Sequence, residues 1–384
     1  MSVVEPQRTI GARRAPPLTL PRKILRLNWA LILLVSAISG IGFLMLYSVA
    51  GGSMDPWAGA QMTRFGVGMV VMLIVALINL RFWRFMAPFA YLVALVLLVA
   101  VEFVGVTGKG AQRWIDLGPI QLQPSEMMKI GLVMALARYY DWLARGRVSN
   151  PIWLVPPLVL TAVPTALILK QPDLGTAVLV VFSAVVVMFL AGVSWWYFIT
   201  AAGLAAGAVH AVFASRGQDW QLLKDYQYRR IDTFVNPEND PLGAGYHITQ
   251  SKIAMGSGGL QGRGFMQGTQ SRLNFLPEKH TDFIFTTLSE EFGFIGSASL
   301  LTLYALVLVF CFIALASTRD RFGGLLIGGL AATFFFYWGV NMAMVMGVLP
   351  VVGVPLPLVS YGGSAMLVLM LAFGLIQSAY VHRR

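Results

Sequence analysis

The sequence predicts an all-α polytopic membrane protein with ten transmembrane helices and a long extracytoplasmic loop between spans seven and eight. Of the 384 residues, 57% are hydrophobic and only 12% are charged, and the mean hydropathy is +0.71. Soluble domains have about a quarter of their residues charged, so this composition excludes an ordinary soluble fold. Apolar runs of membrane-spanning length recur along the chain, and basic residues collect beside their ends.

A membrane-spanning helix needs about 20 mostly apolar residues, so each such run is a predicted span. The predicted spans cover residues 28–49, 62–80, 86–106, 124–143, 153–169, 174–192, 195–214, 292–316, 323–347 and 363–381. The first run, from Trp29 to Val49, is longer than the roughly 7–15 residues of a signal-peptide core, and no clear small-residue cleavage site follows it. We therefore expect it to remain in the membrane.

The distribution of basic residues predicts the orientation. Residues 1–27 contain six basic residues, one acid and four prolines, which is typical of a flexible cytoplasmic tail ahead of a membrane domain over 28–384. The short cytoplasmic segments then hold fourteen Lys and Arg residues, whereas the short outer segments hold Lys109, Arg113 and Lys170. Because cytoplasmic loops are enriched in basic residues, both termini are predicted to be cytoplasmic. This pattern accounts for the net charge of +11 without a nucleic-acid partner.

The predicted extracytoplasmic loop, about residues 215–291, contains nine of the 17 acidic residues and eight basic ones. Structureless loops of that length are uncommon, so we expect short helices that fold back onto the bundle, one of them over Tyr246–Met255. The glycine run Gly256–Gly264 resembles a phosphate-binding loop, but no strand precedes it. Glycines that let the backbone approach the bundle closely explain this run better.

The cysteine and histidine residues predict neither a disulfide framework nor a zinc cluster. The single cysteine, Cys311, lies within an apolar run, and the four histidines have no ligand-like spacing.

The first candidate site residues lie at the start of the fourth predicted span. Pro124 suits the first helical position, and Glu126 then lies in the first turn, where helix-end stabilisation alone would explain a carboxylate. Lys129 lies three residues further along the same face, about one turn into the membrane, where an unpaired charge costs several kcal/mol. We therefore predict a Glu126–Lys129 pair that faces a cavity, with the ammonium group available to an anionic ligand.

Two further polar segments have both a structural and a functional interpretation. Arg113 and Trp114, in the predicted outer loop Gly108–Asp116, would serve either as interfacial anchors or as ligand contacts. Asp173, in the turn before span six, is well placed to cap that helix, and a substrate role is the alternative.

The main candidate for chemistry lies near the end of the long polar segment, in the stretch Leu276–Phe285. Asp282 either caps the helix that enters span eight or acts as a general base, with Lys279 and His280 beside it. The sequence leaves both interpretations open.

The last predicted outer segment, Leu349–Ser364, is apolar but rich in proline and glycine, so a helix cannot easily form through it. We expect a broken or re-entrant segment, which a membrane protein tolerates only where protein or a water-filled cavity surrounds it.

Six segments together resemble the signature stretches of the SEDS family: GKGAQRWIDLG, QPSEMMK, KQPDLGTA, DPLGAGYHITQSKIAMGSGG, GTQSRLNFLPEKHTDFIF and LPVVGVPLPLVSYGGSA. They extend from span three to span ten. The HTDFIF and QPSE stretches are common to the RodA and FtsW branches, whereas the GKGAQRW start, the DPLGAGYHI stretch and GTQS ahead of NFLPEKHTDF are more similar to the RodA branch. An FtsW-like division paralogue remains an alternative.

The resemblance implies a peptidoglycan glycosyltransferase of the cytoplasmic membrane, which polymerises lipid II on the outer face during cell elongation. It also implies a class B penicillin-binding transpeptidase as partner. The family's essential aspartate matches Asp282, its paired acid and lysine match Glu126 and Lys129, and its functionally important tryptophan matches Trp114.

The reaction requires a base for the attacking sugar hydroxyl and cations for the leaving diphosphate. Asp282 is the expected base, and Lys129, Arg113 and Lys279 are the expected cations; a bound divalent metal is another source of positive charge. The alternative to a glycosyltransferase is a transporter, namely a lipid-linked oligosaccharide flippase. Such a protein would need polar groups through the bilayer depth. A non-catalytic scaffold for the transpeptidase is the third alternative.

Overall fold

The computed structural model describes residues 19–108, 111–116, 118, 121–218, 220–221, 228, 232, 244–273 and 278–383 of the chain. Within these residues, nine helices are long and apolar enough to cross a membrane. The predicted class, a helical polytopic membrane protein, is therefore confirmed.

Thirteen α-helices form the described structure. They are α1 Leu20–Leu25, α2 Trp29–Val49, α3 Ala58–Leu77, α4 Leu80–Val104, α5 Pro124–Trp142, α6 Pro151–Lys170, α7 Leu174–Ala191, α8 Trp195–Ala214, α10 Ala244–Ser257, α11 Thr269–Arg272, α12 Ile284–Ser317, α13 Arg321–Val345 and α14 Gly363–Val381. Each of the ten predicted spans coincides with one long helix. The short helix α10 coincides with the piece predicted at Tyr246–Met255.

The fourth predicted span, α5, is not among the nine apolar helices, so the count of ten spans stays a prediction. This helix packs between α4, α6, α7, α13 and α14, and it carries Glu126, Lys129, Arg138 and Asp141. Because neighbouring helices rather than lipid surround most of it, α5 can be more polar than its neighbours.

Polar caps define where several helices begin. The side chains of Asn28, Asn79, Asn150 and Asp320 accept hydrogen bonds from backbone N–H groups in the first turns of α2, α4, α6 and α13. Because a helix N-terminus has unpaired N–H groups, these oxygens stabilise the helix ends.

Several boundaries differ from the predicted ones, and the largest difference is at α12, which begins at Ile284 rather than residue 292. Helix α4 begins at Leu80 rather than residue 86, because the Asn79 side chain caps its first turn and Arg84 pairs with Asp320 at 2.5 Å. Residues Leu20–Leu25 of the predicted flexible tail are helical, and Lys23 Nζ donates a hydrogen bond to Leu77 O at 2.7 Å. The rest of the tail, residues 1–18, lies outside the described residues.

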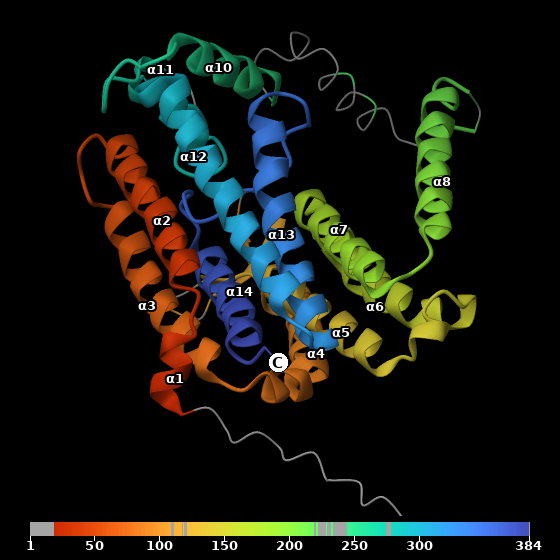
Figure 1. Ribbon diagram of the computed structural model, residues 1–384. Helices are drawn as coiled ribbons and strands as arrows, with labels where there is room; N and C mark the ends of the chain where they lie inside the picture. The colour runs from red at the N-terminus through yellow and green to blue at the C-terminus, as the bar shows by residue number, and fades with distance from the viewer. Residues whose placement is uncertain are drawn as a thin grey trace, which may run out of the picture.

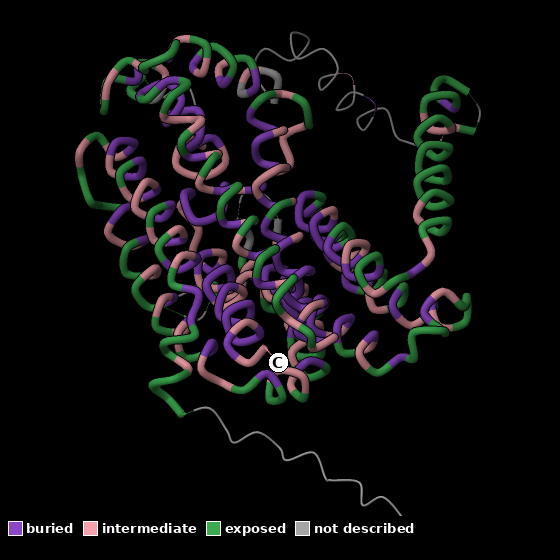
Figure 2. The backbone as a smooth tube through the Cα atoms, in the orientation of Figure 1, coloured by how far each residue is buried: buried purple, intermediate pink, exposed green. Residues whose placement is uncertain are grey.

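The helices form one bundle, with α10 and α11 lying across one end (Figure 1). Helices α13 and α14 are largely buried in the interior, whereas α8 stands apart and has no buried residue (Figure 2). Helix α14 packs on α3, and α13 packs on α7 and α12.

A small antiparallel sheet replaces part of the predicted outer loop Gly108–Asp116. Strand β2, Ala111–Asp116, pairs with β1, Val106–Gly108, on one side and with β3, Gln121–Leu122, on the other. The sequence reasoning missed these strands because they are short. Strand β3 leads directly into α5, so the sheet places Arg113 and Trp114 beside the start of that helix.

The segment between α13 and α14 is non-helical and largely buried, as predicted for a re-entrant segment. The side chains of Leu356 and Val359 are at most 1% exposed. Gly353 has a positive φ of 71°, a conformation that glycine adopts without steric cost.

The glycine run after α10 packs against a break in α12. The break is at Gly293, where φ is 64° and ψ is −158°. A Cβ atom on Gly258 would lie 2.0 Å from Ser289 O, and one on Gly262 would lie 2.1 Å from Glu291 O. The expectation that glycines permit close backbone approach is therefore confirmed, and nothing here resembles a βαβ nucleotide site.

Part of the predicted loop 215–291 is outside the described residues, namely residues 219, 222–227, 229–231, 233–243 and 274–277. The start of the DPLGAGYHI stretch and the residues Leu276 and Pro277 fall within these gaps.

Candidate functional site

A polar cavity of about 420 Å³ lies where several helices begin. The starts of α5, α7 and α14, the turn before α12, the β2 and β3 strands and the re-entrant segment all contribute. Its lining residues are Arg113, Trp114, Gln121, Gln123, Glu126, Asp173, Thr176, His280, Thr281, Asp282, Tyr337, Gly353, Val354, Pro355, Tyr361, Gly362, Gly363, Ser364 and Ala365.

Five of the predicted site residues therefore line one cavity. They are Arg113, Trp114, Glu126, Asp173 and Asp282. They come from positions up to 169 residues apart along the chain, from Arg113 to Asp282. Lys129 and Lys279 are not in the lining of this cavity. Among the residues that the structure describes, the cavity lining thus presents three carboxylates, those of Glu126, Asp173 and Asp282, together with one guanidinium group.

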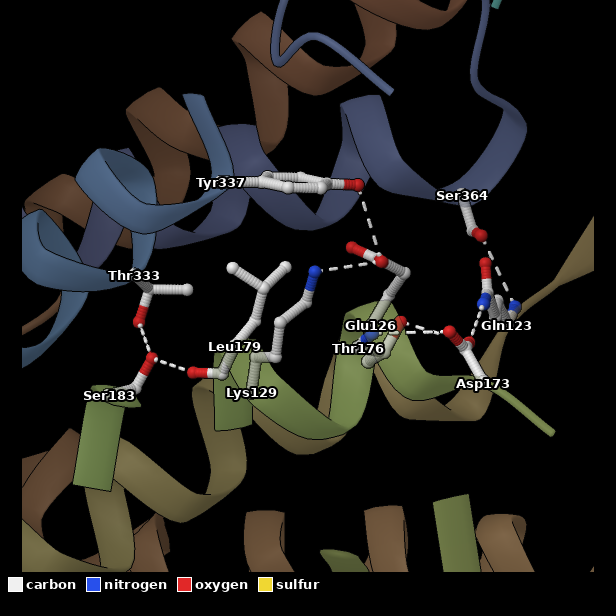
Figure 3. Close-up of polar contacts among 10 residues, drawn as sticks. All are labelled: Gln123, Glu126, Lys129, Asp173, Thr176, Leu179, Ser183, Thr333, Tyr337 and Ser364. Carbon is white, nitrogen blue, oxygen red and sulfur yellow. Dashed lines mark hydrogen bonds and ion pairs between the residues drawn. The ribbon is translucent and has the colours of Figure 1, made fainter. Parts of the chain in front are cut away.

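The predicted Glu126–Lys129 pair is present and buried. Lys129 Nζ lies 2.8 Å from Glu126 Oε1, and the two residues are 3% and 4% exposed. The ammonium group also lies 3.9 Å from the centre of the Tyr337 ring, and the Tyr337 hydroxyl donates to Glu126 Oε1 at 3.4 Å. Figure 3 shows Lys129 between Glu126 and Thr333, deeper along α5 than the residues around Gln123. The ammonium group therefore stands behind Glu126 rather than at the cavity surface.

Asp173 both caps a helix and lines the cavity, so the two interpretations of this residue are compatible. Its Oδ1 accepts a hydrogen bond from Thr176 N at 3.1 Å, and its Oδ2 accepts from Thr176 Oγ1 at 2.9 Å. The Gln123 side chain also donates to Oδ2 at 3.3 Å, and Gln123 N donates to Ser364 Oγ at 3.2 Å (Figure 3). These bonds tie together the starts of α5, α7 and α14, whose positive dipole ends favour an anionic ligand.

Arg113 is the cation in the lining of the cavity. Its Nε donates to Gln171 O at 3.0 Å, and its Nη2 donates to Pro172 O at 2.5 Å. These two bonds fix the guanidinium group on the turn before α7, and an arginine has five N–H donors in all. Trp114, from the same strand, lies in the cavity wall.

Asp282 does not cap α12. The N-cap position of that helix is Phe283, and no side chain there makes a capping hydrogen bond. The cap interpretation of Asp282 is therefore wrong, and the residue lines the cavity instead. A Cβ atom on Gly353 would lie 3.8 Å from Asp282 Oδ2, which places the carboxylate beside the re-entrant segment.

The neighbours of Asp282 in sequence occupy different surroundings. The His280 ring lies in the cavity wall and stacks on Trp57, with ring centres 4.5 Å apart. Lys279 lies outside the cavity lining, and its partial burial lowers the pKa of the ammonium group from 10.5.

Several lining residues were missed by the sequence reasoning. Gln123 and Ser364 belong to segments that had been singled out, and their positions at helix starts are a signal that could have identified them. Tyr337 lies within an aromatic run of α13, and nothing in that run distinguishes the ring that faces Glu126 from its neighbours.

A second cavity, of about 640 Å³, lies between α6, α7 and α8. Its lining residues are apolar except for Thr161, Thr165, Tyr197 and Thr200, and none is charged. Among the described residues around it, Tyr197 is the one ionisable group, and no carboxylate or ammonium group lines the cavity beside it.

Metal binding has no preformed site in the described part of the chain, where no group of three or more His, Cys, Asp or Glu side chains is arranged to hold an ion. Arg113 is therefore the positive group that the described cavity itself supplies for an anion.

The bundle and its cavity define a polytopic membrane protein with a carboxylate-rich site at the junction of several helix N-termini. Residues 28–384 match the family FTSW_RODA_SPOVE, described as "Cell cycle protein". The chain belongs to this family, and the resemblance to SEDS proteins is thereby confirmed.

Known members of the family are similar over nearly the whole chain. The peptidoglycan glycosyltransferase MrdB of Escherichia coli strain K12 is 44% identical over 363 residues, covering 93% of this chain and 94% of MrdB. A chain from a structure described as "Structural coordination of polymerization and crosslinking by a peptidoglycan synthase complex" is 32% identical, with a TM-score of 0.79, covering 92% of this chain and 97% of that one. The rod shape determining protein RodA of Thermus thermophilus, known from a crystal structure, is 30% identical with a TM-score of 0.68, covering 93% and 96%.

Proposed function

We propose that this protein is a peptidoglycan glycosyltransferase that polymerises lipid II in cell elongation. The observation that carries the proposal is that Asp282, Arg113 and Glu126 line one cavity in a chain of this family, with Lys129 paired to Glu126 behind the cavity wall. The 44% identity to a peptidoglycan glycosyltransferase over nearly the whole chain supports the reaction class.

The chemical step joins the 4-hydroxyl of one GlcNAc to the anomeric carbon of a MurNAc that carries undecaprenyl diphosphate. Asp282 accepts the proton of the hydroxyl as the new C–O bond forms, and the bond from the anomeric carbon to the diphosphate oxygen breaks. General-base catalysis of this kind contributes roughly 10²–10⁴-fold. An α-linked donor giving a β-linked product requires inversion in a single displacement.

The leaving diphosphate gains negative charge as the bond breaks, so positive groups must face it. Arg113 is the residue we assign to this role, because it lines the cavity and its guanidinium group is held in place by two backbone carbonyls. Lys129 supports the site indirectly, because its ion pair holds the Glu126 carboxylate in place. A bound divalent metal would supply further positive charge to the diphosphate.

The orientation of the site follows from the distribution of basic residues. Both termini lie in the cytoplasm, and the cavity opens on the outer face of the cytoplasmic membrane, where lipid II is presented. The partner is a class B penicillin-binding transpeptidase, which cross-links the new strands; the structural similarity to a chain of a peptidoglycan synthase complex supports this assignment.

The flippase alternative is disfavoured by the placement of charge. A flippase needs polar groups through the bilayer depth, whereas the ionisable residues of the described cavity gather where α5, α7 and α14 begin. A division role, as in an FtsW-like paralogue, is the runner-up for physiology, since one family contains both branches.

The test uses the purified chain and its transpeptidase partner in detergent, with labelled lipid II as substrate. We expect glycan polymer with β-linked disaccharides, because polymerisation needs no second membrane compartment. If lipid II remains unpolymerised in detergent but crosses the bilayer of reconstituted vesicles, the protein is a transporter and the proposal fails.

A further inference from the structure

The turn that carries Asp282 is held in place through its backbone. Three successive carbonyl groups of this turn accept hydrogen bonds from the C-terminal part of the chain, although about sixty to eighty residues separate the partners. Tyr361 N donates to His280 O at 2.9 Å, Ser360 Oγ donates to Thr281 O at 2.6 Å, and Asn341 Nδ2 donates to Asp282 O at 2.9 Å. The backbone of the turn is thereby fixed on α13 and on the re-entrant segment.

Asn341 makes the bond that is nearest to the carboxylate. This residue of α13 is 0% exposed, and its Nδ2 also donates to Val354 O at 2.6 Å. Both groups that face the amide nitrogen are carbonyl oxygens, which only accept hydrogen bonds. The orientation of the amide is therefore fixed. If the amide were flipped, its oxygen would face the two carbonyl oxygens, and neither can donate a hydrogen bond.

The Asn341 amide therefore links Asp282 to the wall of the cavity. Val354 and Gly353 both line the cavity, and a Cβ atom on Gly353 would lie 3.8 Å from Asp282 Oδ2. One side-chain nitrogen thus sets the spacing between the residue with the carboxylate and the segment beside it. Reacting groups must be held closely, since a misplacement of about 1 Å can cost about 100-fold in rate.

We propose that Asn341 is a positioning residue for Asp282, which fixes the carboxylate at its working distance from the cavity wall. This inference rests on the proposed function. Asn341 is not among the residues that line the cavity, so it acts through Asp282 and not through the substrate.

The test compares Asn341→Leu, which keeps a similar size but removes the amide, with the wild-type full-length chain bound to its transpeptidase partner. We expect kcat for lipid II polymerisation to fall about 100-fold while KM stays nearly unchanged, because the substrate contacts remain and only the base is displaced.

The matched control is Gln377→Met. Gln377 is also a buried amide, 1% exposed, and it bridges Asn28 N and Asn28 O with hydrogen bonds of 2.9 Å each. It lies near the end of α14, the helix whose start lines the cavity. Gln377→Met should lower the thermal midpoint about as much as Asn341→Leu does, while kcat stays close to the wild-type value. If the two variants lose kcat equally, the effect of Asn341 is general destabilisation and the proposal is overturned.

A coupling measurement identifies the residue through which Asn341 acts. In an Asp282→Glu background the carboxylate is already displaced, so adding Asn341→Leu should lower kcat far less than it does in the wild type. Fully multiplicative effects would contradict the inference.

Ser360→Ala gives a second test if Asn341→Leu does not fold, because Ser360 holds the adjacent carbonyl of Thr281. We expect Ser360→Ala to lower kcat, and Ser360→Thr, which keeps the hydroxyl, to restore most of it. An unchanged kcat in Ser360→Ala would count against the idea that the bonds to this turn position the base.

The inference and the proposed function fail in different ways. If Asp282→Asn still polymerises lipid II, the assignment of the base is wrong, whatever Asn341→Leu does. If Asp282→Asn is inactive and Asn341→Leu keeps the wild-type kcat, only the positioning role is wrong.

Discussion

Replacing Lys129 by Met tests whether Lys129 serves as one half of a structural ion pair or as a cation that binds the substrate. The Lys129 side chain is 3% exposed, and its Nζ lies 2.8 Å from Glu126 Oε1. Removing the ammonium group leaves a buried carboxylate without an opposite charge. Breaking a buried pair in this way costs about 3–5 kcal/mol, so we expect a loss of that size in the free energy of unfolding.

Two matched variants make this expectation specific. Glu126→Gln combined with Lys129→Met removes both charges, so it should recover most of the stability that Lys129→Met loses. Lys170→Met removes the lysine of another Lys–Glu pair, at 2.6 Å from Glu102 Oε2, but its side chain is 69% exposed. That change should cost less than about 1 kcal/mol, because water screens an exposed pair.

The assay combines detergent-solubilised unfolding with polymerisation at several lipid II concentrations. If Lys129 is structural, the loss of stability accompanies any loss of activity, and KM changes little. A rise in KM of about tenfold, equal to about 1.4 kcal/mol of binding free energy, with unchanged stability would show that the ammonium group binds substrate, and our account of the pair would be refuted.

Three further changes have expected outcomes that the structure specifies. Gly353→Ala forces a side chain into a positive φ of 71°, which costs about 1–2 kcal/mol. We expect it to lower the polymerisation rate more than the control Gly256→Ala does, because a Cβ atom on Gly256 would meet nothing within 4 Å. Gly262→Ala places a Cβ atom 2.1 Å from Glu291 O, so we expect faster limited proteolysis of the glycine run, again with Gly256→Ala as control. Burial lowers the pKa of Lys279 in the folded protein from 10.5. At pH values between this lowered pKa and 10.5, the unfolded chain binds more protons than the folded chain, so the free energy of unfolding rises with pH. Unfolding midpoints across that interval should rise more in the wild type than in Lys279→Gln, and equal slopes would contradict this.

Much of the fold could be predicted because membrane helices are encoded locally. An uninterrupted apolar run must form a helix in lipid, so α2, α6, α7, α8 and α14 begin and end within a few residues of the predicted spans. Proline and glycine residues likewise identified the non-helical segment before α14.

The candidate site was only partly predictable, because residue chemistry is local but contacts are not. Glu126 and Lys129 could be paired from their spacing on one helix, and this prediction is confirmed. The rotation of α5 in the bundle places Lys129 behind Glu126, and spacing contains no information on that rotation. Likewise, no local pattern places Asn341 of α13 against the carbonyl of Asp282, since packing of distant segments makes that contact.

The most direct test of the account is the initial rate of lipid II polymerisation by Asp282→Asn, measured beside the wild type in the purified complex. Asparagine has nearly the shape of aspartate but cannot act as the base, so we expect a loss of about 10²–10⁴-fold with an unchanged unfolding midpoint and intact partner binding. Polymerisation at the wild-type rate would contradict the assignment of Asp282 as the base.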